Sequence, residues 1–334
     1  MQIHSTSWLY AKPEFTYDSL RAEHESLTEA ERRRILQERY GFEDEIIETP
    51  ELVSRALVLL AEAIDAIDEK EAYETALFIN PAHVQSDIFR LAFLRAESFD
   101  ANATARRIVD YWERKVELFG TAKAFGNYVS LADFYPKDEE ALAKGGLRLL
   151  PYCDDRGRAI VFSFSAYYDS DVESMVKKLW LMFHKAIEKE DKNTDAIQKK
   201  GIVFIVGNGR PTKSPSPFHN FEEHKRFIKA IAQDASIFPM RSFCIHYFSP
   251  NIWVARMLEH LLPQFGQKCR HRMIVHSSTN KMENLAKLAE CGISLDIVPR
   301  ELGGELNFDY QGWLSYQLFE EQFDAGIDLE EEIL

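Results

Sequence analysis

Short apolar segments alternate with amphipathic helical segments along residues 158–298. The run GIVFIVG at residues 201–207 is almost continuously apolar, which is typical of a strand covered on both faces. Strands and helices that alternate at this spacing predict an α/β domain with a largely parallel sheet. The extended segments are expected at residues 158–163, 201–207, 242–248, 273–276 and 293–298.

Helices are expected between these strands, and the one at residues 251–262 has the most apolar face. Its apolar residues recur at helical spacing, and Ile252 and Trp253 widen the stripe. Such a face must cover either ordinary core or a removable ligand. The helices are expected at residues 172–190, 221–237, 251–262 and 281–290, and the stripe consists of Val254, Met257, Leu258, Leu261 and Leu262.

The first part of the chain predicts helices and almost no strands over residues 27–120. Ser26 and Glu29 fit a capping box for a helix that ends at Gly41, and Thr49-Pro50 opens the next helix. Two further helices are expected at residues 84–97 and 101–119.

Near Tyr152 the sequence pattern changes from helical segments to alternating strand and helix segments, which divides the chain into a helical part and an α/β part. We expect four units: a helical extension (1–80), a helical subdomain (81–150), the α/β domain (151–310) and an acidic C-terminal tail (311–334).

The net charge of -14 is concentrated at the C-terminus, because residues 301–334 hold ten Asp or Glu and no Lys or Arg. The remaining 44 acidic and 40 basic residues nearly balance, which argues against nucleic-acid binding. The four cysteines show no CxxC spacing and indicate reduced thiols in a cytoplasmic protein. No secretory signal and no apolar run of roughly 20 residues is seen, so membrane contact is expected to be peripheral.

Motifs for catalysis, metals or cofactors are weak. The segment Gly207-Asn208-Gly209 lacks the third glycine of a dinucleotide loop, and Pro211 follows where a helix should begin, so a surface turn is the better interpretation. Neither HExxH nor GxSxG occurs, and the histidines are scattered. No cofactor, metal or catalytic residue is predicted, and an α/β enzyme that uses dispersed residues is the least favoured alternative.

Four basic residues lie directly before the strand at 273–276. They fit either a solvated turn, which charge runs usually form, or a contact with an anionic lipid headgroup or membrane. The solvated turn is favoured and both interpretations stay open. We call this set the basic cluster; it comprises Lys268, Arg270, His271 and Arg272.

Five segments, in the same order, resemble the CRAL-TRIO lipid-binding family. LAFLRAESFD (91–100) is similar to the family's N-terminal helical motif, and DRGRAI (155–160) to its first strand. The strand and turn at 202–209, PMRSFCIHYFSP (239–250) and IVPRELGGE (297–305) match the later motifs. The resemblance covers about residues 85–310.

The resemblance implies a mixed sheet that floors a hydrophobic pocket, with residues 252–262 as a mobile gate helix and Gly303-Gly304 near its hinge. It departs from phosphatidylinositol-binding members at Glu97-Ser98 and at Phe248, which argues against phosphoinositide specificity. The residues that we expect to line the pocket are Phe162, Phe204, Phe243, Ile245, Tyr247, Trp253, Met257, Leu258 and Leu261.

We therefore expect a cytoplasmic protein without enzymatic activity that binds one lipid or other hydrophobic molecule and transfers or presents it at membranes. The alternative is a regulatory module of the same family in which lipid binding is secondary. In that case the acidic segment 324–332 would be a docking site for a basic protein partner.

Overall fold

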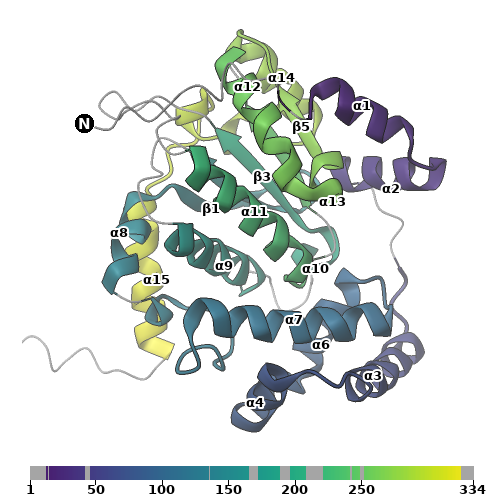
Figure 1. Cartoon of the computed structure of the whole chain (residues 1–334). Helices are drawn as coiled ribbons and strands as arrows, with labels where there is room; N and C mark the ends of the chain where they lie inside the picture. The colour runs from purple at the N-terminus through teal and green to yellow at the C-terminus, as the bar shows by residue number, and fades with distance from the viewer. Residues whose placement is uncertain are drawn as a thin grey trace, which may run out of the picture.

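The computed structural model describes residues 13, 15–41, 46–134, 136–164, 172–188, 196–207, 221–240, 243–248 and 252–324 of the 334-residue chain. A central sheet is flanked by helices, with a layer of helices below it and α15 along one side (Figure 1).

The sheet has five strands in the order β1-β2-β3-β4-β5. β1 pairs antiparallel with β2, and the other three pairs are parallel, which confirms the largely parallel α/β sheet. The sequence pattern did not indicate β1. The strands are β1 (Leu147–Cys153), β2 (Ala159–Phe164), β3 (Ile202–Gly207), β4 (Phe243–Phe248) and β5 (Met273–His276).

The strand expected at residues 293–298 is wrong. Its centre is the 3-10 turn η5 (Leu295–Ile297), in which the Ile297 N–H donates to the Ser294 carbonyl (3.2 Å). The apolar side chains of Ile293 and Val298 are buried without a neighbouring strand. Apolar residues in a short segment can therefore satisfy burial without joining a ladder.

The connections between the parallel strands lie over one face of the sheet. Because strand order follows chain order, crossovers of one hand all fall on the same side. Phe204 pairs with Val161 and Ile245, and all three share one core with these helices. The helices are α9 (Val172–Glu188), α10 (Ala196–Lys200), α11 (Phe221–Ile237), α12 (Ile252–Leu261), η4 (Leu262–Phe265) and α13 (Gly266–His271).

The opposite face of the sheet forms a second, smaller core. Phe162 and Ile205 pair in register and pack with Leu285 and Leu288 of α14 (Lys281–Glu290). The 3-10 turns η5 and η6 (Arg300–Leu302) complete this side. Both faces of the sheet are therefore covered, as the continuous apolar run in β3 indicated.

The lower layer consists of helices, as expected for this part of the chain. Thr49 caps α3, and its hydroxyl accepts a hydrogen bond from the Leu52 N–H (3.2 Å). The helix expected at residues 84–97 begins three residues later, because the Ser86 hydroxyl caps it by accepting from the Phe89 N–H (3.2 Å), and Val84 belongs to the separate short helix α5. The helices are α3 (Pro50–Asp65), α4 (Glu71–Ile79), α5 (Pro81–Val84), α6 (Asp87–Ala96) and α7 (Ala101–Phe119).

Buried polar contacts join this layer to the sheet domain. The carboxylate of Asp234 on α11 accepts from Arg114 of α7 (2.8 Å) and from Trp180 of α9 (3.0 Å). Tyr111 of α7 meets the imidazole of His184 on α9 at 3.0 Å. One buried network therefore fixes α7 to two crossover helices. The turn η2 (Leu131–Asp133) and α8 (Pro136–Lys144) lead from here into β1.

Residues 15–41 lie apart from the lower layer, beside β5 and α13 (Figure 1). They form α1 (Tyr17–Glu25) and α2 (Glu29–Tyr40). The cap of α2 differs from the expectation: Thr28 and Glu31 form the capping box, rather than Ser26 and Glu29. Gly41 ends the helix in a left-handed conformation, as its position indicated.

The described part of the acidic tail, residues 311–324, is helical. The helix α15 (Tyr310–Asp324) lies along η2 and the end of α9. The docking segment expected at 324–332 lies outside the described residues except for Asp324. Within the described ranges no helix is long and apolar enough to cross a bilayer. The same ranges contain no group of His, Cys, Asp and Glu side chains arranged to hold a metal ion.

Candidate functional site

The gate helix of the sequence prediction corresponds to α12, which follows β4 in the chain and shares the main core with it. Successive strand residues point to opposite faces, so Ile245 and Tyr247 share the face toward α12, together with Phe204 of β3. Met257, Leu258 and Leu261 of α12 belong to the same buried cluster. We call these six side chains the gate layer.

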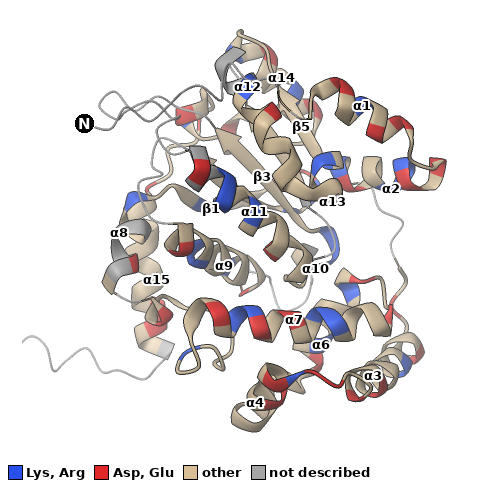
Figure 2. Cartoon of the chain, viewed as in Figure 1, with Lys and Arg blue, Asp and Glu red and all other residues tan. Residues whose placement is uncertain are grey.

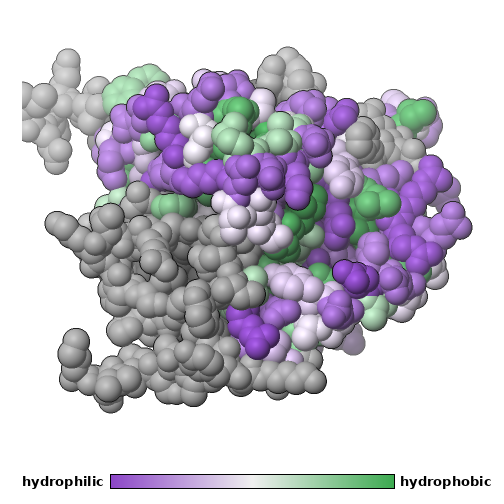
Figure 3. Space-filling model, turned by 90° about the horizontal axis from the view of Figure 1, so that it is seen from above, coloured by the Kyte–Doolittle hydropathy of each residue, from purple (hydrophilic) through white to green (hydrophobic). Residues whose placement is uncertain are grey.

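The gate layer is fully packed in this structure, with no member more than 6% exposed. Fully burying such a side chain is worth about 1.5–3 kcal/mol, so the packed layer stabilises α12 in this position. Opening α12 without a ligand therefore costs many contacts, and a hydrophobic ligand between helix and sheet would replace them. The described surface seen from above is mostly hydrophilic with smaller hydrophobic areas, in keeping with this inward burial (Figure 3).

Of the other three expected pocket residues, only Phe162 has a described side chain, and it differs in placement. Phe162 lies on the opposite face, where its ring stacks on Phe164 (centroids 5.7 Å apart) and packs in the second core. Val161 of β2, like Ala159, belongs to the main core instead. The side chains of Phe243 and Trp253 lie outside the described residues. The structure therefore brings six of the nine expected residues together.

A buried group with reactive side-chain types lies on the other face of β4 and is electrically neutral. His246 Nδ1 is 2.9 Å from His276 Nε2, and Cys244 Sγ is 3.6 Å from His246 Nε2. Burial lowers the pKa of His246 and lowers that of His276 to about 4. Burial also raises the pKa of the Cys244 thiol to about 12. Because the thiolate is the nucleophilic form, this group has the character of structural packing.

The basic cluster is held by acidic residues of α1 and α2. Arg270 forms a two-pronged contact with Glu23 (3.0 and 2.5 Å), and Arg272 pairs with Glu38. Hydrogen bonding from Arg270 lowers the pKa of Glu23. His271 is buried beside Glu23, and burial lowers its pKa.

Further contacts fix α1 and α2 in this position. Arg39 donates to the carbonyl of His271 (2.6 Å), and the Arg270 guanidinium lies 4.7 Å from the ring centre of Phe15. The Tyr17 hydroxyl donates to the Ala255 carbonyl of α12 (3.5 Å). The arginines of the cluster are therefore internal ion-pair partners rather than a solvated turn. The Lys268 side chain lies outside the described residues.

Steric constraints in a tight turn explain why glycine occupies positions 303 and 304. Gly303 is left-handed at φ +97°, and a Cβ on Gly304 would lie 2.1 Å from the Val298 carbonyl oxygen. The side chains nearest to Gly303 are Leu285 and Lys281 of α14. The structure thus places the pair in a tight turn against α14, and a hinge role for it stays a prediction.

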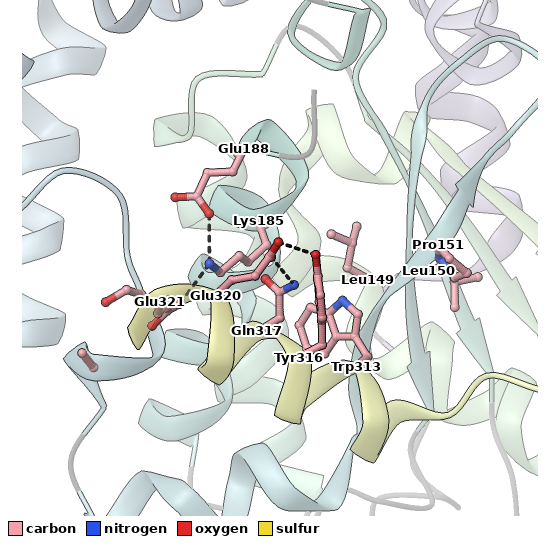
Figure 4. Close-up of a pocket in the computed structure, with 12 residues that line it drawn as sticks. Leu149, Leu150, Pro151, Lys185, Glu188, Trp313, Tyr316, Gln317, Glu320 and Glu321 are labelled. Carbon is pink, nitrogen blue, oxygen red and sulfur yellow. Dashed lines mark hydrogen bonds and ion pairs between the residues drawn. The ribbon is translucent and has the colours of Figure 1, made fainter. Parts of the chain in front are cut away.

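A pocket of about 900 Å³, which sequence reasoning missed, lies between α15, the end of α9 and β1 (Figure 4). Leu149 and Trp313 contribute apolar walls, and Lys185 lies between Glu188 (3.1 Å) and Glu321 (2.9 Å). The signal available in the sequence was the helical spacing of aromatic and acidic residues within 313–321. That spacing does not reveal which strand faces the helix.

Comparisons with known proteins give distant relatives. No family model matches the chain. It is 26% identical over 246 residues to Clavesin-2 of Homo sapiens and of Rattus norvegicus, which covers 71% of this chain and 68% of the relative. It is 25% identical over 225 residues to the Homo sapiens alpha-tocopherol transfer protein-like protein, covering 65% and 58%. Both relatives are CRAL-TRIO proteins, which confirms the resemblance found in the sequence.

Proposed function

We propose that this chain, a relative of the CRAL-TRIO lipid-binding proteins, binds one lipid or other hydrophobic molecule beneath α12 and transfers or presents it at membranes. The similarity to these relatives supports lipid binding and transfer in general terms. The name of one relative describes transfer, which supports a binding role over a catalytic one.

The gate layer is the observation that carries the proposal. It brings side chains of the sheet face and of one short helix into the same buried core, so moving α12 away would uncover Met257, Leu258 and Leu261. Phe204 would keep its contact with Phe183 of α9, whose ring centre lies 5.8 Å away. Enclosing an acyl chain is worth roughly 0.8 kcal/mol for each buried methylene. A ligand in this layer would therefore repay the apolar contacts that α12 loses when it moves away from the sheet.

Membrane contact requires a further step in this proposal. The arginines of the basic cluster are paired with Glu23 and Glu38, so they are not available to lipid phosphates while α1 and α2 stay docked. We propose that separation of α1 and α2 frees the cluster and at the same time releases α12 from Tyr17. Phosphoinositide specificity is not part of the proposal, because Glu97 pairs with Arg107 at the position where basic residues are typical.

Ligand occupancy tests the proposal directly. Native mass spectrometry of the purified chain should show a co-purifying hydrophobic molecule. Leu258→Trp should fill part of the ligand volume and lower that occupancy. Leu285→Trp is the matched control, because Leu285 is an equally buried helical leucine on the opposite face of the sheet. Unchanged occupancy in folded Leu258→Trp protein, or equal losses in both variants, would refute the placement of the ligand.

A regulatory module is the second candidate function, and the acidic C-terminus favours it. In this case a basic protein partner would bind residues 324–332 and lipid binding would be secondary. Deleting residues 325–334 leaves α15 in place and separates the two functions. Loss of a protein partner with unchanged lipid occupancy would favour the regulatory module.

A further inference from the structure

The helix α15 exposes a stripe of large apolar side chains. Tyr316, Phe319 and Phe323 are 56%, 51% and 73% exposed and lie at i, i+3 and i+7, which places them on one side of the helix. The rings of Phe319 and Phe323 lie 6.5 Å apart, nearly parallel. The inner side of the same helix packs on the main core through Trp313 and Leu314. Packing of α15 therefore does not account for the outer stripe.

The stripe runs into the pocket of about 900 Å³. In Figure 4, Tyr316 and Trp313 project from α15 toward Leu149 of β1, and Glu320 and Glu321 lie farther along the helix toward α9. This volume is within the range of pockets that bind ligands in proteins, so it can also admit a side chain of a bound partner. Pocket and stripe form one continuous surface, which we call the α15 surface.

The charge of the α15 surface is negative. Its pocket is lined by three carboxylates, Glu188, Glu320 and Glu321, against the single ammonium of Lys185. No Lys or Arg occurs in residues 301–334, and the C-terminal part of α15 is red in Figure 2. An anionic membrane would be repelled here, and a cation would be attracted.

The contacts already present show how a cation would be held. Lys185 already pairs with Glu188 and Glu321, so the exposed Glu320 is the pocket carboxylate that would receive an incoming cation. The Tyr316 hydroxyl donates to the Glu320 carboxylate, which fixes the ring beside an acceptor. An aromatic face next to carboxylates favours guanidinium and ammonium groups through cation–π attraction and charge-assisted hydrogen bonds.

We propose that the α15 surface binds a basic amphipathic segment of a partner protein, with an Arg or Lys side chain in the pocket and apolar side chains over Phe319 and Phe323. A small cation alone would leave the aromatic stripe uncovered. A peptide covers both, and interfaces are enriched in the aromatic residues present here. This site is separate from the gate layer, so it goes beyond lipid binding.

Calorimetric titration of the full chain with a synthetic peptide tests the proposal. The probe is a helical peptide with Arg on one side and Leu at neighbouring i, i+4 positions, and the matched peptide has Glu in place of Arg. The Arg peptide should bind and the Glu peptide should not. Glu320→Lys and Phe319→Ser should each lower the affinity for the Arg peptide by about tenfold or more, which is the scale of one lost interface contact.

Glu290→Lys is the control, because Glu290 is an exposed residue of α14 and the change in charge is the same. Equal weakening by Glu290→Lys and Glu320→Lys would mean non-specific attraction and would overturn the proposal. So would absence of Arg-peptide binding in folded protein. A third outcome would also overturn the proposal: the chain binds phosphatidylcholine vesicles but not the peptide, and Phe319→Ser abolishes the vesicle binding. The α15 surface would then be a membrane-binding surface. Lipid occupancy of these variants should stay unchanged, which keeps this test separate from that of the gate layer.

Discussion

The basic cluster and the α15 surface are two charged regions with opposite surroundings. The arginines of the cluster are largely buried and form ion pairs with Glu23 and Glu38, residues far away in the sequence. The acidic α15 surface exposes Glu320 and its aromatic rings, and its contacts are mainly within α15 and with η2 and α9. Charge in a sequence therefore does not by itself reveal which region is available to a partner.

The difference also separates the two proposed activities. Contact of the basic cluster with a membrane requires α1 and α2 to move, so it is conditional on a conformational change. Contact of the α15 surface with a peptide requires no such movement. Changes in one region should accordingly leave the other unaffected, because sites that share no partners behave additively.

The largest effect is expected from breaking the ion pair of the cluster. Glu23→Lys places a like charge beside Arg270 and removes a charge-assisted contact worth roughly 1.5–3 kcal/mol. This loss corresponds to about a tenfold to hundredfold shift toward the state in which α1 and α2 are separated from the basic cluster. Sedimentation with vesicles that contain phosphatidylserine should show correspondingly stronger binding. The double variant Glu23→Lys with Arg270→Glu should restore an ion pair at these positions and return vesicle binding to its weak level. Equal vesicle binding by all three proteins would show that α1 does not mask the cluster.

A smaller effect is expected from pH. Burial lowers the pKa of both His24 and His271, whose rings lie 5.5 Å apart near Glu23, Arg39 and Arg270. When α1 and α2 detach, both histidines regain ordinary pKa values near 6.5. They then bind protons more readily than when α1 and α2 are docked. The docked position of α1 and α2 on the basic cluster is therefore favoured above about pH 6.5. It becomes less stable as the pH falls below that value.

Vesicle binding measured at two pH values checks this sign. Binding should increase between about pH 7 and 5.5, and the increase should shrink in a variant with both His24→Asn and His271→Asn. The pocket and stripe of the α15 surface contain no histidine, so Arg-peptide binding should stay constant over the same range. A parallel change in peptide binding would contradict the separation of the two regions.

The smallest effect is expected for the stability of variants in the exposed stripe, and a gate-layer variant serves as the reference with a large loss. Phe319→Ser and Phe323→Ser change exposed side chains, so each should alter the free energy of unfolding by less than about 0.5 kcal/mol. Leu258→Ala in the gate layer should cost about 2–5 kcal/mol, because Leu258 is fully buried. Denaturant titration compares the three. A large loss for either phenylalanine variant would show that the stripe packs within the molecule.

Local signals determined most helices and the class of the fold. The helix at 101–119 begins at the Asp100 cap and ends before Gly120, and its limits match α7. The strand at 273–276 and the helix at 281–290 also match the structure. Caps and periodic apolar residues act between neighbours a few positions apart, so the sequence displays them directly.

The tertiary structure alone decided which residues meet. Adjacent β2 residues Val161 and Phe162 are both apolar, and only the register shows that Val161 faces the main core. Likewise, no local pattern indicates that Arg270 pairs with Glu23, because 247 positions separate them. Face and pairing depend on how distant segments pack, and a sheet covered on both sides removes the alternation that would otherwise reveal its buried face.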